Sequence, residues 1–305
     1  MKRTESHPGT PEVSVVIATY NMGQYVAEAV ESVLAQTRPS LEVIVVDDGS
    51  TDDTQSRLER FNTDPRVVVL SQENSGQAKA KNAGLLRSKG RFLAFCDADD
   101  LWLPDKLERQ LPLFEQNPGT GVVYSRAIAL CSDGSREEFQ TPSCVRGDVL
   151  HAMFVRNIVP FGTAVVRREC LFETGLFDES LAMGIDWDLW LRVAVKWEFD
   201  FVPEPTYVYR VWDGQMSNNW RGRYEYALRI MASFLATHRE RLPSGIVSLA
   251  YADTYTNLAA EELHHVGVRA CTRTLWSALK HKPGFWPAWR LLLLMPWHRL
   301  QAIRA

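Results

Sequence analysis

Three carboxylates stand within four residues at Asp97, Asp99 and Asp100, directly after the apolar run Phe92–Cys96. Like charges this close repel one another and raise each other's pKa unless a cation or a hydrogen-bond donor compensates. Mg²⁺ and Mn²⁺ prefer oxygen ligands and often share them with a substrate diphosphate. A cation held here would stabilise a diphosphate leaving group as a Lewis acid. The stretch is equally typical of an acidic turn before a helix that begins at Pro104.

Two other acidic segments have the same double interpretation. Asp48 lies in Asp47–Thr51, where Asp and Gly suit a plain turn, yet its carboxylate could accept a hydrogen bond from a nucleobase or a ribose. Asp186 and Asp188 open a helical pattern over 186–197, where acids commonly cap or stabilise a helix N-terminus. A carboxylate kept ionised there is also suited to take a proton from an attacking hydroxyl as general base.

A phosphate contact is the chemical interpretation of the segment Asn74–Gln77 and the lysines that follow it. Backbone N–H groups and the positive charge of Lys79 and Lys81 could both meet a phosphate at the start of a helix. The alternative is that these lysines cover a solvated helix face.

The elements that must position these groups are predicted most clearly in the first half of the chain. Short apolar, β-branched runs predict buried strands, and apolar residues at helical spacing predict helices between them. The expected strands are 13–18, 41–46, 67–70 and 92–96, and the expected helices are 25–34 and 77–87. This order predicts a mostly parallel sheet with crossover helices, whose ligands bind beyond the carboxyl ends of the strands. The polar clusters after three of these strands would then share one edge.

The second half is less regular. Strand patterns are present at 122–125 and 162–166, and a third at 199–211 contains Pro203 and Pro205, which favours an edge or a bent strand. The chain after Arg221 is predicted to be helical. It includes a helical pair within 258–279 and a basic amphipathic segment over 286–305.

Bulk composition bounds the class of protein. The 305 residues are 46% hydrophobic and 23% charged, which is typical of a globular chain with one large α/β domain and an appendage, or two modest domains. A net charge of -3 gives no argument for nucleic-acid binding. The five cysteines are odd in number and form no CxxC pair, which favours a reducing cytoplasm over a disulfide framework or a zinc site. We expect neither a secretory signal nor a run of roughly 20 apolar residues that spans a bilayer.

Taken in order, five segments resemble the inverting family 2 glycosyltransferases with the GT-A fold. They are Val13–Asn21, Val46–Asp52, Asn74–Gln77 continuing to Lys81–Gly84, Phe95–Asp100 and Asp186–Arg192. The resemblance implies an α/β, Rossmann-like fold with a mostly parallel central sheet, helices on both faces and a C-terminal helical extension. The expected divisions are an N-terminus of 1–11, a catalytic domain of 12–220 and a helical region of 221–305. The catalytic domain would comprise a nucleotide half of 12–100 and an acceptor half of 101–220.

The resemblance also implies roles on the donor side. Ala18 and Tyr20 would lie beside the nucleotide, and Asp48 would contact the base, often uracil in this family. Asp97 would lie near the ribose or the metal, and Asp99 would be the metal ligand proper, holding Mn²⁺ or Mg²⁺.

On the acceptor side, Asp186 falls where the family places the general base. Direct attack by the acceptor hydroxyl would then invert the anomeric configuration. Asp188 is the neighbour that could hold this role instead, and Ile185 stands where the family frequently has an acid. Relatives often carry a His two residues after Arg210, whereas this chain has Trp212. Arg210 has two interpretations, a phosphate contact or a structural ion pair.

The function implied is metal-assisted single displacement of a sugar from a nucleotide sugar, expected to be a UDP-sugar. The acceptor would be a saccharide or a lipid-linked hydroxyl in bacterial cell-surface polysaccharide or glycolipid synthesis, and Lys79, Asp188 and Arg210 are further candidate contacts to phosphate or acceptor. The segment 286–305 would lie on the cytoplasmic face of a membrane, or pack on the catalytic domain or a second subunit of a homodimer.

Three other classes compete with this interpretation. A sugar nucleotidyltransferase would show a Gly-rich basic loop where this chain has Ala18–Asn21. A phosphatase with an aspartyl nucleophile would carry its paired acids after the first strand. A non-catalytic nucleotide-sugar-binding relative would not need Asp97, Asp99 and Asp186.

Overall fold

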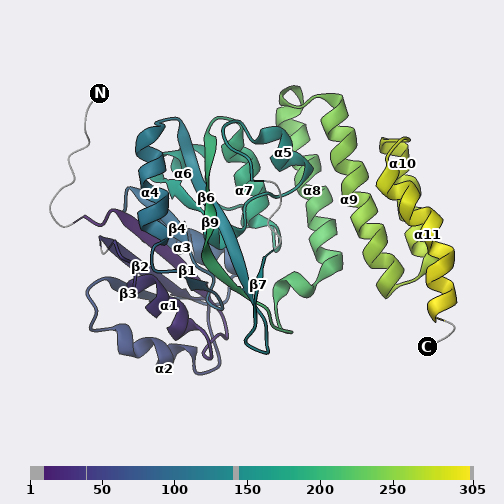
Figure 1. Ribbon diagram of the computed structural model, residues 1–305. Helices are drawn as coiled ribbons and strands as arrows, with labels where there is room; N and C mark the ends of the chain where they lie inside the picture. The colour runs from purple at the N-terminus through teal and green to yellow at the C-terminus, as the bar shows by residue number, and fades with distance from the viewer. Residues whose placement is uncertain (1–9, 39, 140–143, 303–305) are drawn as a thin grey trace. The chain divides into compact units, whose positions relative to one another are not determined.

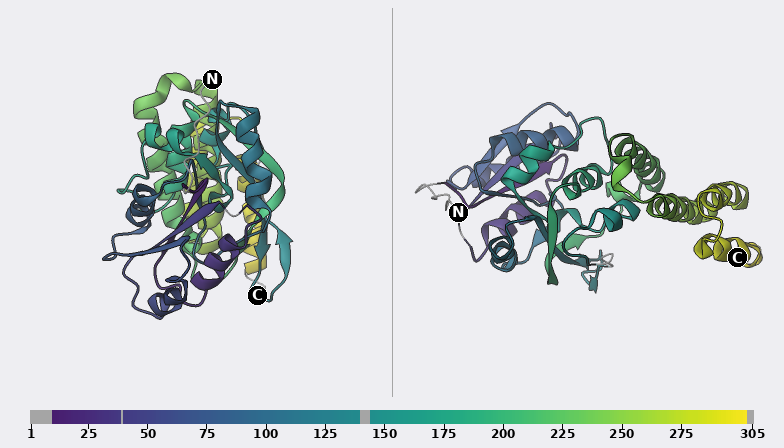
Figure 2. Two further views of the ribbon diagram at one scale, coloured as in Figure 1. Left: turned by 90° about the vertical axis from the view of Figure 1, so that its left-hand side faces the viewer. Right: turned by 90° about the horizontal axis from the view of Figure 1, so that it is seen from above.

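The computed structural model describes residues 10–38, 40–139 and 144–302, and its elements are shown in Figure 1 and, from two further sides, in Figure 2. The chain divides into two compact units. The first runs up to Val149 and resumes over Ile158–Gln215, and the second combines Leu150–Asn157 with the chain from Met216 onwards.

The first unit is built on a sheet whose N-terminal part is parallel. Its strands lie in the order β3-β2-β1-β4, with bounds Val67–Ser71, Leu41–Asp47, Val13–Thr19 and Phe92–Phe95. Each parallel pair keeps an unbroken register, as in β1 and β2 from Val13 opposite Leu41 to Thr19 opposite Asp47. All four predicted strands are therefore confirmed, and their carboxyl ends meet at one edge as expected.

The sheet continues from β4 with mixed pairing, in the order β4-β8-β6-β9-β5. These strands are β8 (Val165–Arg167), β6 (Thr120–Leu130), β9 (Glu198–Arg210) and β5 (Leu101–Trp102), and β7 (Arg136–Glu138) pairs with β6 alone. β6 and β9 pair in parallel, and their register shifts opposite the prolines of β9. The prolines predicted an edge or a bent strand. β9 lies between β6 and β5 and is no edge, and its irregular register at Pro203 and Pro205 fits the second alternative, since proline cannot donate to the ladder.

Helices cover both faces of this sheet. They are α1 (Val26–Leu34), α2 (Thr54–Leu58), α3 (Gln77–Arg87), α4 (Lys106–Gln116), α6 (Arg168–Thr174) and α7 (Ile185–Ala194), with short 3₁₀ turns η1 (Glu59–Phe61) and η2 (Phe161–Thr163). Val43 and Val45 pack in one core cluster with residues of α1 and α4, whereas Ile44 and Val46 pack against Ala80 of α3. This alternation is the period of a strand buried on both faces. The predicted α/β class is confirmed.

The second unit is helical throughout its described residues. Its elements are α5 (Leu150–Val155), η3 (Met216–Asn218), α8 (Trp220–His238), η4 (Arg239–Arg241), α9 (Ser244–His265), α10 (Val268–His281) and α11 (Trp286–Ala302). The expected C-terminal helices are thus confirmed, although α9 begins well before residue 258. Gly267 separates α9 from α10 because its φ of 121° lies in a region that side chains disfavour. In the part of the chain that the structure describes, we find no helix with both the length and the apolar character to cross a membrane.

Candidate active site

The acidic loop after β4 divides into one buried carboxylate and two accessible ones. Asp100 is buried, with 1% of its surface exposed. Its two oxygens accept hydrogen bonds from the Tyr207 hydroxyl and from the backbone N–H of Arg210, each at 2.7 Å. Burial, followed by the charges of Asp99 and Asp97, raises the pKa of Asp100 well above its usual range. Asp100 therefore anchors the loop to β9.

Asp97 and Asp99 are the members of the loop that remain open to a ligand. Asp97 is 33% exposed and accepts a hydrogen bond from Lys81 Nζ at 3.0 Å. Asp99 is partly buried and accepts one from the indole N–H of Trp212 at 2.9 Å. Partial burial, followed by repulsion from Asp97, raises the pKa of Asp99. A cation would relieve this repulsion, so the two carboxylates fit a divalent metal.

The side chains present also suggest which groups would complete the coordination of such a metal. Among the described residues, no three His, Cys, Asp or Glu side chains gather into a group that could hold a metal ion. Mg²⁺ and similar ions are commonly held by one or two carboxylates, with substrate phosphates and water supplying the other ligands. Asp97 and Asp99 match that arrangement.

Trp212 and Arg210 contact the acidic loop at Asp99. The Trp212 ring lies 5.6 Å from the ring of Tyr25, between ring centroids. Arg210 donates from Nε to the Asp99 carbonyl at 2.8 Å, pairs with Glu28 at 2.7 Å and lies over the Tyr25 ring. These contacts favour the structural ion pair for Arg210, and its phosphate contact stays a prediction.

Of the two lysines that could meet a phosphate, Lys81 is the one that lies at the acidic loop. Its side chain is buried, and its ammonium lies 4.6 Å from the centroid of the Phe161 ring as well as beside Asp97. Lys79, the lysine we expected to contact phosphate, is exposed. The signal was available in the spacing of α3, because Ala78, Lys81 and Leu85 recur on its buried face and Lys79 does not.

Asp48 lies at the end of β2, as expected for a base contact, and it also organises the loop that leads into α3. One of its oxygens accepts from Gln72 Nε2 at 2.7 Å and from the Ser75 N–H at 2.9 Å. The other accepts from the Gly76 N–H at 2.8 Å. The carboxylate thus fixes the backbone beside the expected nucleotide position, and only the oxygen that accepts from Gly76 has a lone pair left for a further bond.

The end of β1 is tied to the same edge. Tyr20 is 45% exposed, and Ala18 is partly buried within the strand. Asn21 adopts a φ of 54°, and its side-chain oxygen accepts from the Thr51 N–H at 2.8 Å. Its own N–H donates to Ser50 Oγ at 2.9 Å. The loops after β1 and β2 are therefore held together where a nucleotide would lie.

Asp186 and Asp188 both lie in the first turn of α7, which begins after Gly184 at Ile185. Asp188 pairs with the Arg192 guanidinium at 2.8 Å, and Arg192 also donates to the carbonyls of residues 174–176. Asp188 therefore has a structural role in holding that segment. Asp186 and Asp188 are both partly exposed, and Asp186 stays the predicted general base.

Hydrogen bonds from α3 hold the loop that leads into α7. Gln77 donates to the Ala182 carbonyl at 3.0 Å, and Asn82 donates to the Phe177 carbonyl at 3.0 Å. The same helix supplies Lys81 to Asp97. One helix thus connects the segment before Asp186 to the acidic loop.

An aromatic cluster makes a second connection between these two parts. Phe95 of β4 stacks on Phe161 at 4.7 Å and contacts Phe177 edge-on at 5.5 Å, between ring centroids. Phe161 also lies 6.4 Å from the ring of Trp190 in α7. Pairs of this kind contribute about 0.5–1.5 kcal/mol beyond the area they bury. The cluster therefore fixes α7 relative to the end of β4.

We expect Gly162→Ala to destabilise the fold, because a Cβ on Gly162 would collide with the ring of Tyr207. Overpacking of this kind typically costs about 1–3 kcal/mol, and here it would also disturb the Tyr207 bond to Asp100. Each kcal/mol should lower the Tm by about 2–4 °C in thermal unfolding. Gly245→Ala is the matched control, since nothing lies near its added Cβ. An equal Tm for both variants would show that Gly162 has room.

Comparison with known proteins agrees with this α/β fold. The family model for glycosyl transferase family 2 matches residues 14–169. The chain belongs to this family. A glycosyltransferase of Rickettsia felis, itself uncharacterised, is 33% identical over 187 residues, which are 61% of this chain and 30% of that relative. TuaG of Bacillus subtilis, named for teichuronic acid biosynthesis, is 48% identical over 127 residues, 41% of this chain and 50% of TuaG. The chain thus spans half or less of the length of these two relatives.

Solved structures with the same fold share little sequence with this chain. Residues 1-349 of S. aureus TarS in complex with UDP-GlcNAc align with a TM-score of 0.69 at 18% identity, covering 88% of this chain and 81% of that one. The mannosyltransferase PcManGT from Pyrobaculum calidifontis, in complex with GDP-Man and Mn²⁺, gives a TM-score of 0.64 at 23% identity, covering 96% and 81%. These likenesses confirm the expected GT-A fold.

Proposed function

We propose that this chain transfers a sugar from a nucleotide sugar to an acceptor hydroxyl by single displacement, with inversion at the anomeric carbon. The observation that carries the proposal is the difference in burial and hydrogen bonding among the three carboxylates of the acidic loop. Both oxygens of Asp100 accept hydrogen bonds from Tyr207 and Arg210, whereas Asp97 and Asp99 are only partly buried. Two accessible carboxylates in one loop suit a metal ion that also binds a diphosphate.

In this mechanism Asp97 and Asp99 would hold Mn²⁺ or Mg²⁺, which would stabilise the negative charge of the departing diphosphate. Lys81 adds a positive charge on the same side, since its ammonium lies against Asp97. Asp186 would accept the proton of the acceptor hydroxyl as the new glycosidic bond forms and the bond to the diphosphate breaks. The N-terminal turn of α7 favours the ionised form that a base needs.

The donor we propose is a UDP-sugar, with its base beside Asp48 and the loop at Ala18 and Tyr20. Support for UDP comes from the structural neighbour that was solved with UDP-GlcNAc, whereas another neighbour was solved with GDP-Man and Mn²⁺. Because both nucleotides occur among these neighbours, GDP-sugars belong in any donor screen. Catalysis would reside in residues 12–220, and 221–305 would serve another role.

The acceptor we propose is a saccharide or lipid-linked hydroxyl in bacterial cell-surface polysaccharide synthesis. Similarity to TuaG, which is named for teichuronic acid biosynthesis, supports this assignment. We place the reaction in the cytoplasm, in line with an odd number of cysteines and no CxxC pair in the sequence, and in peripheral contact with the membrane when the acceptor is lipid-linked.

Nucleotide sugars should raise the Tm of the chain when Mn²⁺ is present. A ligand at about 100 times its Kd adds about 2.7 kcal/mol to the free energy of unfolding by mass action. We would screen UDP- and GDP-sugars by thermal shift, each with Mn²⁺ and with EDTA, and then measure release of the nucleoside diphosphate. A shift without any metal-dependent hydrolysis or transfer would favour a non-catalytic binding protein. No shift with any donor would contradict the proposal.

A further inference from the structure

The charges of this chain are distributed very unevenly. All 37 Asp and Glu residues precede Leu263, although the whole chain has a net charge of only -3. The remaining segment to Ala305 has no acidic residue and seven basic ones, which are Arg269, Arg273, Lys280, Lys282, Arg290, Arg299 and Arg304. The last helices therefore form a cationic surface on an otherwise anionic chain.

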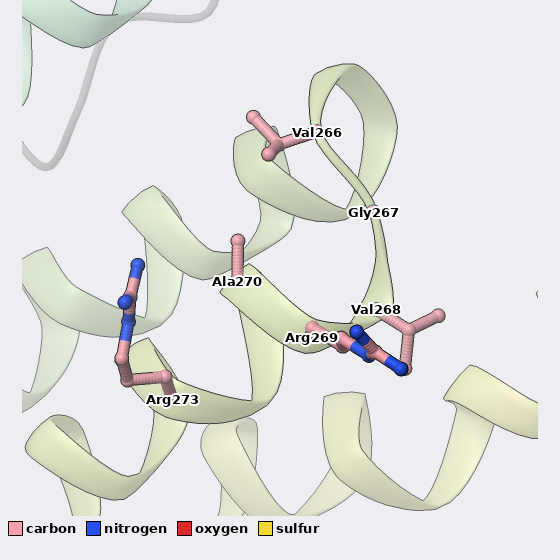
Figure 3. A pocket seen from close by; sticks show the side chains of 6 residues that line it. All are labelled: Val266, Gly267, Val268, Arg269, Ala270 and Arg273. Atoms are coloured by element: carbon pink, nitrogen blue, oxygen red, sulfur yellow. The ribbon is translucent and has the colours of Figure 1, made fainter.

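Helix α10 presents part of this charge on a single face. Arg269, Arg273, Trp276 and Lys280 follow the spacing of one helix face, and all four are exposed. The opposite face of the helix is buried in the core of the second unit, through Cys271, Leu275, Ala278 and Leu279. Within the described residues, none of these three cations takes part in an ion pair. Figure 3 shows the hollow at the start of this face, lined by Arg269, Arg273 and the chain around Gly267.

Helix α11 continues the surface with apolar side chains. Trp286 is 64% exposed and Leu293 is 63% exposed, although exposed residues of this type are normally scattered singly. Trp289 of α11 contacts Trp276 of α10 edge-on, with 6.5 Å between ring centroids. The two helix faces therefore form one basic-aromatic face, which we define by Arg269, Arg273, Trp276, Lys280, Trp286, Trp289, Arg290 and Leu293.

We propose that this basic-aromatic face binds the surface of a bilayer that contains anionic lipid. Lys and Arg near such a surface are attracted to its phosphates, and exposed Trp and Leu side chains insert at headgroup level. This proposal identifies the residues that would make the peripheral membrane contact included in the proposed function. The biological purpose of this binding rests on the proposed function. The binding itself does not, because it is measured with vesicles and without glycosyl transfer.

The composition of the face argues against the other occupants. In a symmetric dimer the same patch would face itself and bring its like charges together, which is unfavourable. A soluble polyanion would be attracted by the cations but would leave Trp286 and Leu293 in water. A bilayer surface satisfies both the charge and the apolar side chains.

The test is co-sedimentation of the full chain with vesicles of phosphatidylcholine, and with vesicles of equal parts phosphatidylcholine and phosphatidylglycerol. We expect binding to the anionic vesicles that weakens as salt is added. Each Lys or Arg close to the surface contributes about fivefold to partitioning. The variant Arg273→Glu/Lys280→Glu should therefore bind at least about 30-fold more weakly, and Trp286→Ser should also bind more weakly.

The matched control is Arg87→Glu/Lys89→Glu, which makes the same change of charge at two exposed positions in the first unit. It should bind anionic vesicles like the wild type, and all variants should keep the wild-type Tm and donor hydrolysis. Equal binding to both vesicle types, or equal losses in the control and the α10 variant, would overturn the proposal. The proposal would also be overturned if the chain bound polyphosphate but no vesicles, and if Arg273→Glu/Lys280→Glu weakened that binding. A dimer in sedimentation velocity that this variant dissociates would overturn it as well.

Discussion

Asp186→Asn is expected to lower glycosyl transfer about 10²-fold or more, the usual scale of a general base, while donor binding stays at the wild-type level. The amide keeps the size of the side chain and its place in the first turn of α7, but it cannot take the proton of the acceptor hydroxyl. Donor affinity should be unchanged because we propose the donor site at Asp97, Asp99 and Asp48. Initial rates with a donor identified by thermal shift, together with calorimetry, would measure both quantities.

Asp188→Asn is the matched control, two residues along the same helix. Its carboxylate pairs with Arg192, which holds the carbonyls of 174–176. Losing a hydrogen-bonded charge in a partly buried pair costs about 1–3 kcal/mol, so this variant should lose stability and keep most of its kcat. If Asp186→Asn turned over normally and Asp188→Asn did not, the base would be Asp188.

Asp99→Asn and Asp99→Ala should abolish Mn²⁺-dependent donor binding. Either change removes the negative charge that compensates the cation, and the Asn variant still offers an oxygen to the Trp212 indole. Comparing the two separates loss of the metal ligand from loss of that hydrogen bond. Calorimetric titration of the donor, with Mn²⁺ and with EDTA, is the measurement.

The outcome that contradicts this role is undiminished Mn²⁺-dependent binding in both variants. Asp100→Asn provides a useful contrast, because Asp100 is buried and bonded to Tyr207 and Arg210. That variant should show its main effect in the Tm. Loss of metal dependence with Asp100→Asn at an unchanged Tm would move the ligand to Asp100.

The parallel half of the sheet could be predicted because its strands are short apolar runs, of which β1, β2 and β3 are rich in β-branched residues. Two kinds of element could not. β5 spans only Leu101–Trp102, and α5 spans Leu150–Val155, so both are too short for their pattern to repeat along the chain. The strand expected at 162–166 is instead the turn η2 followed by β8. Gly162 lies against the Tyr207 ring there, a long-range contact that no local pattern reveals.

The candidate site was predictable in its residue types more than in its connections. Asp97, Asp99 and Asp186 stand where the motifs placed them, and their roles remain predictions. The contact of Lys81 with Asp97 depends on how α3 packs against the sheet, which propensity does not determine. The bonds of Asp48 to Ser75 and Gly76 likewise join residues far apart in the sequence.

The aromatic cluster of Phe95, Phe161, Phe177 and Trp190 has a consequence for protein engineering. Its rings set the spacing between the end of β4 and α7 through the sizes of rigid, packed groups. The loops that would meet an acceptor can then be exchanged without moving Asp186, provided that these rings are kept. Conversely, a chimera that replaced Phe161 with a smaller residue would shift both the end of β4 and the start of α7, whatever acceptor its new loops were chosen to bind.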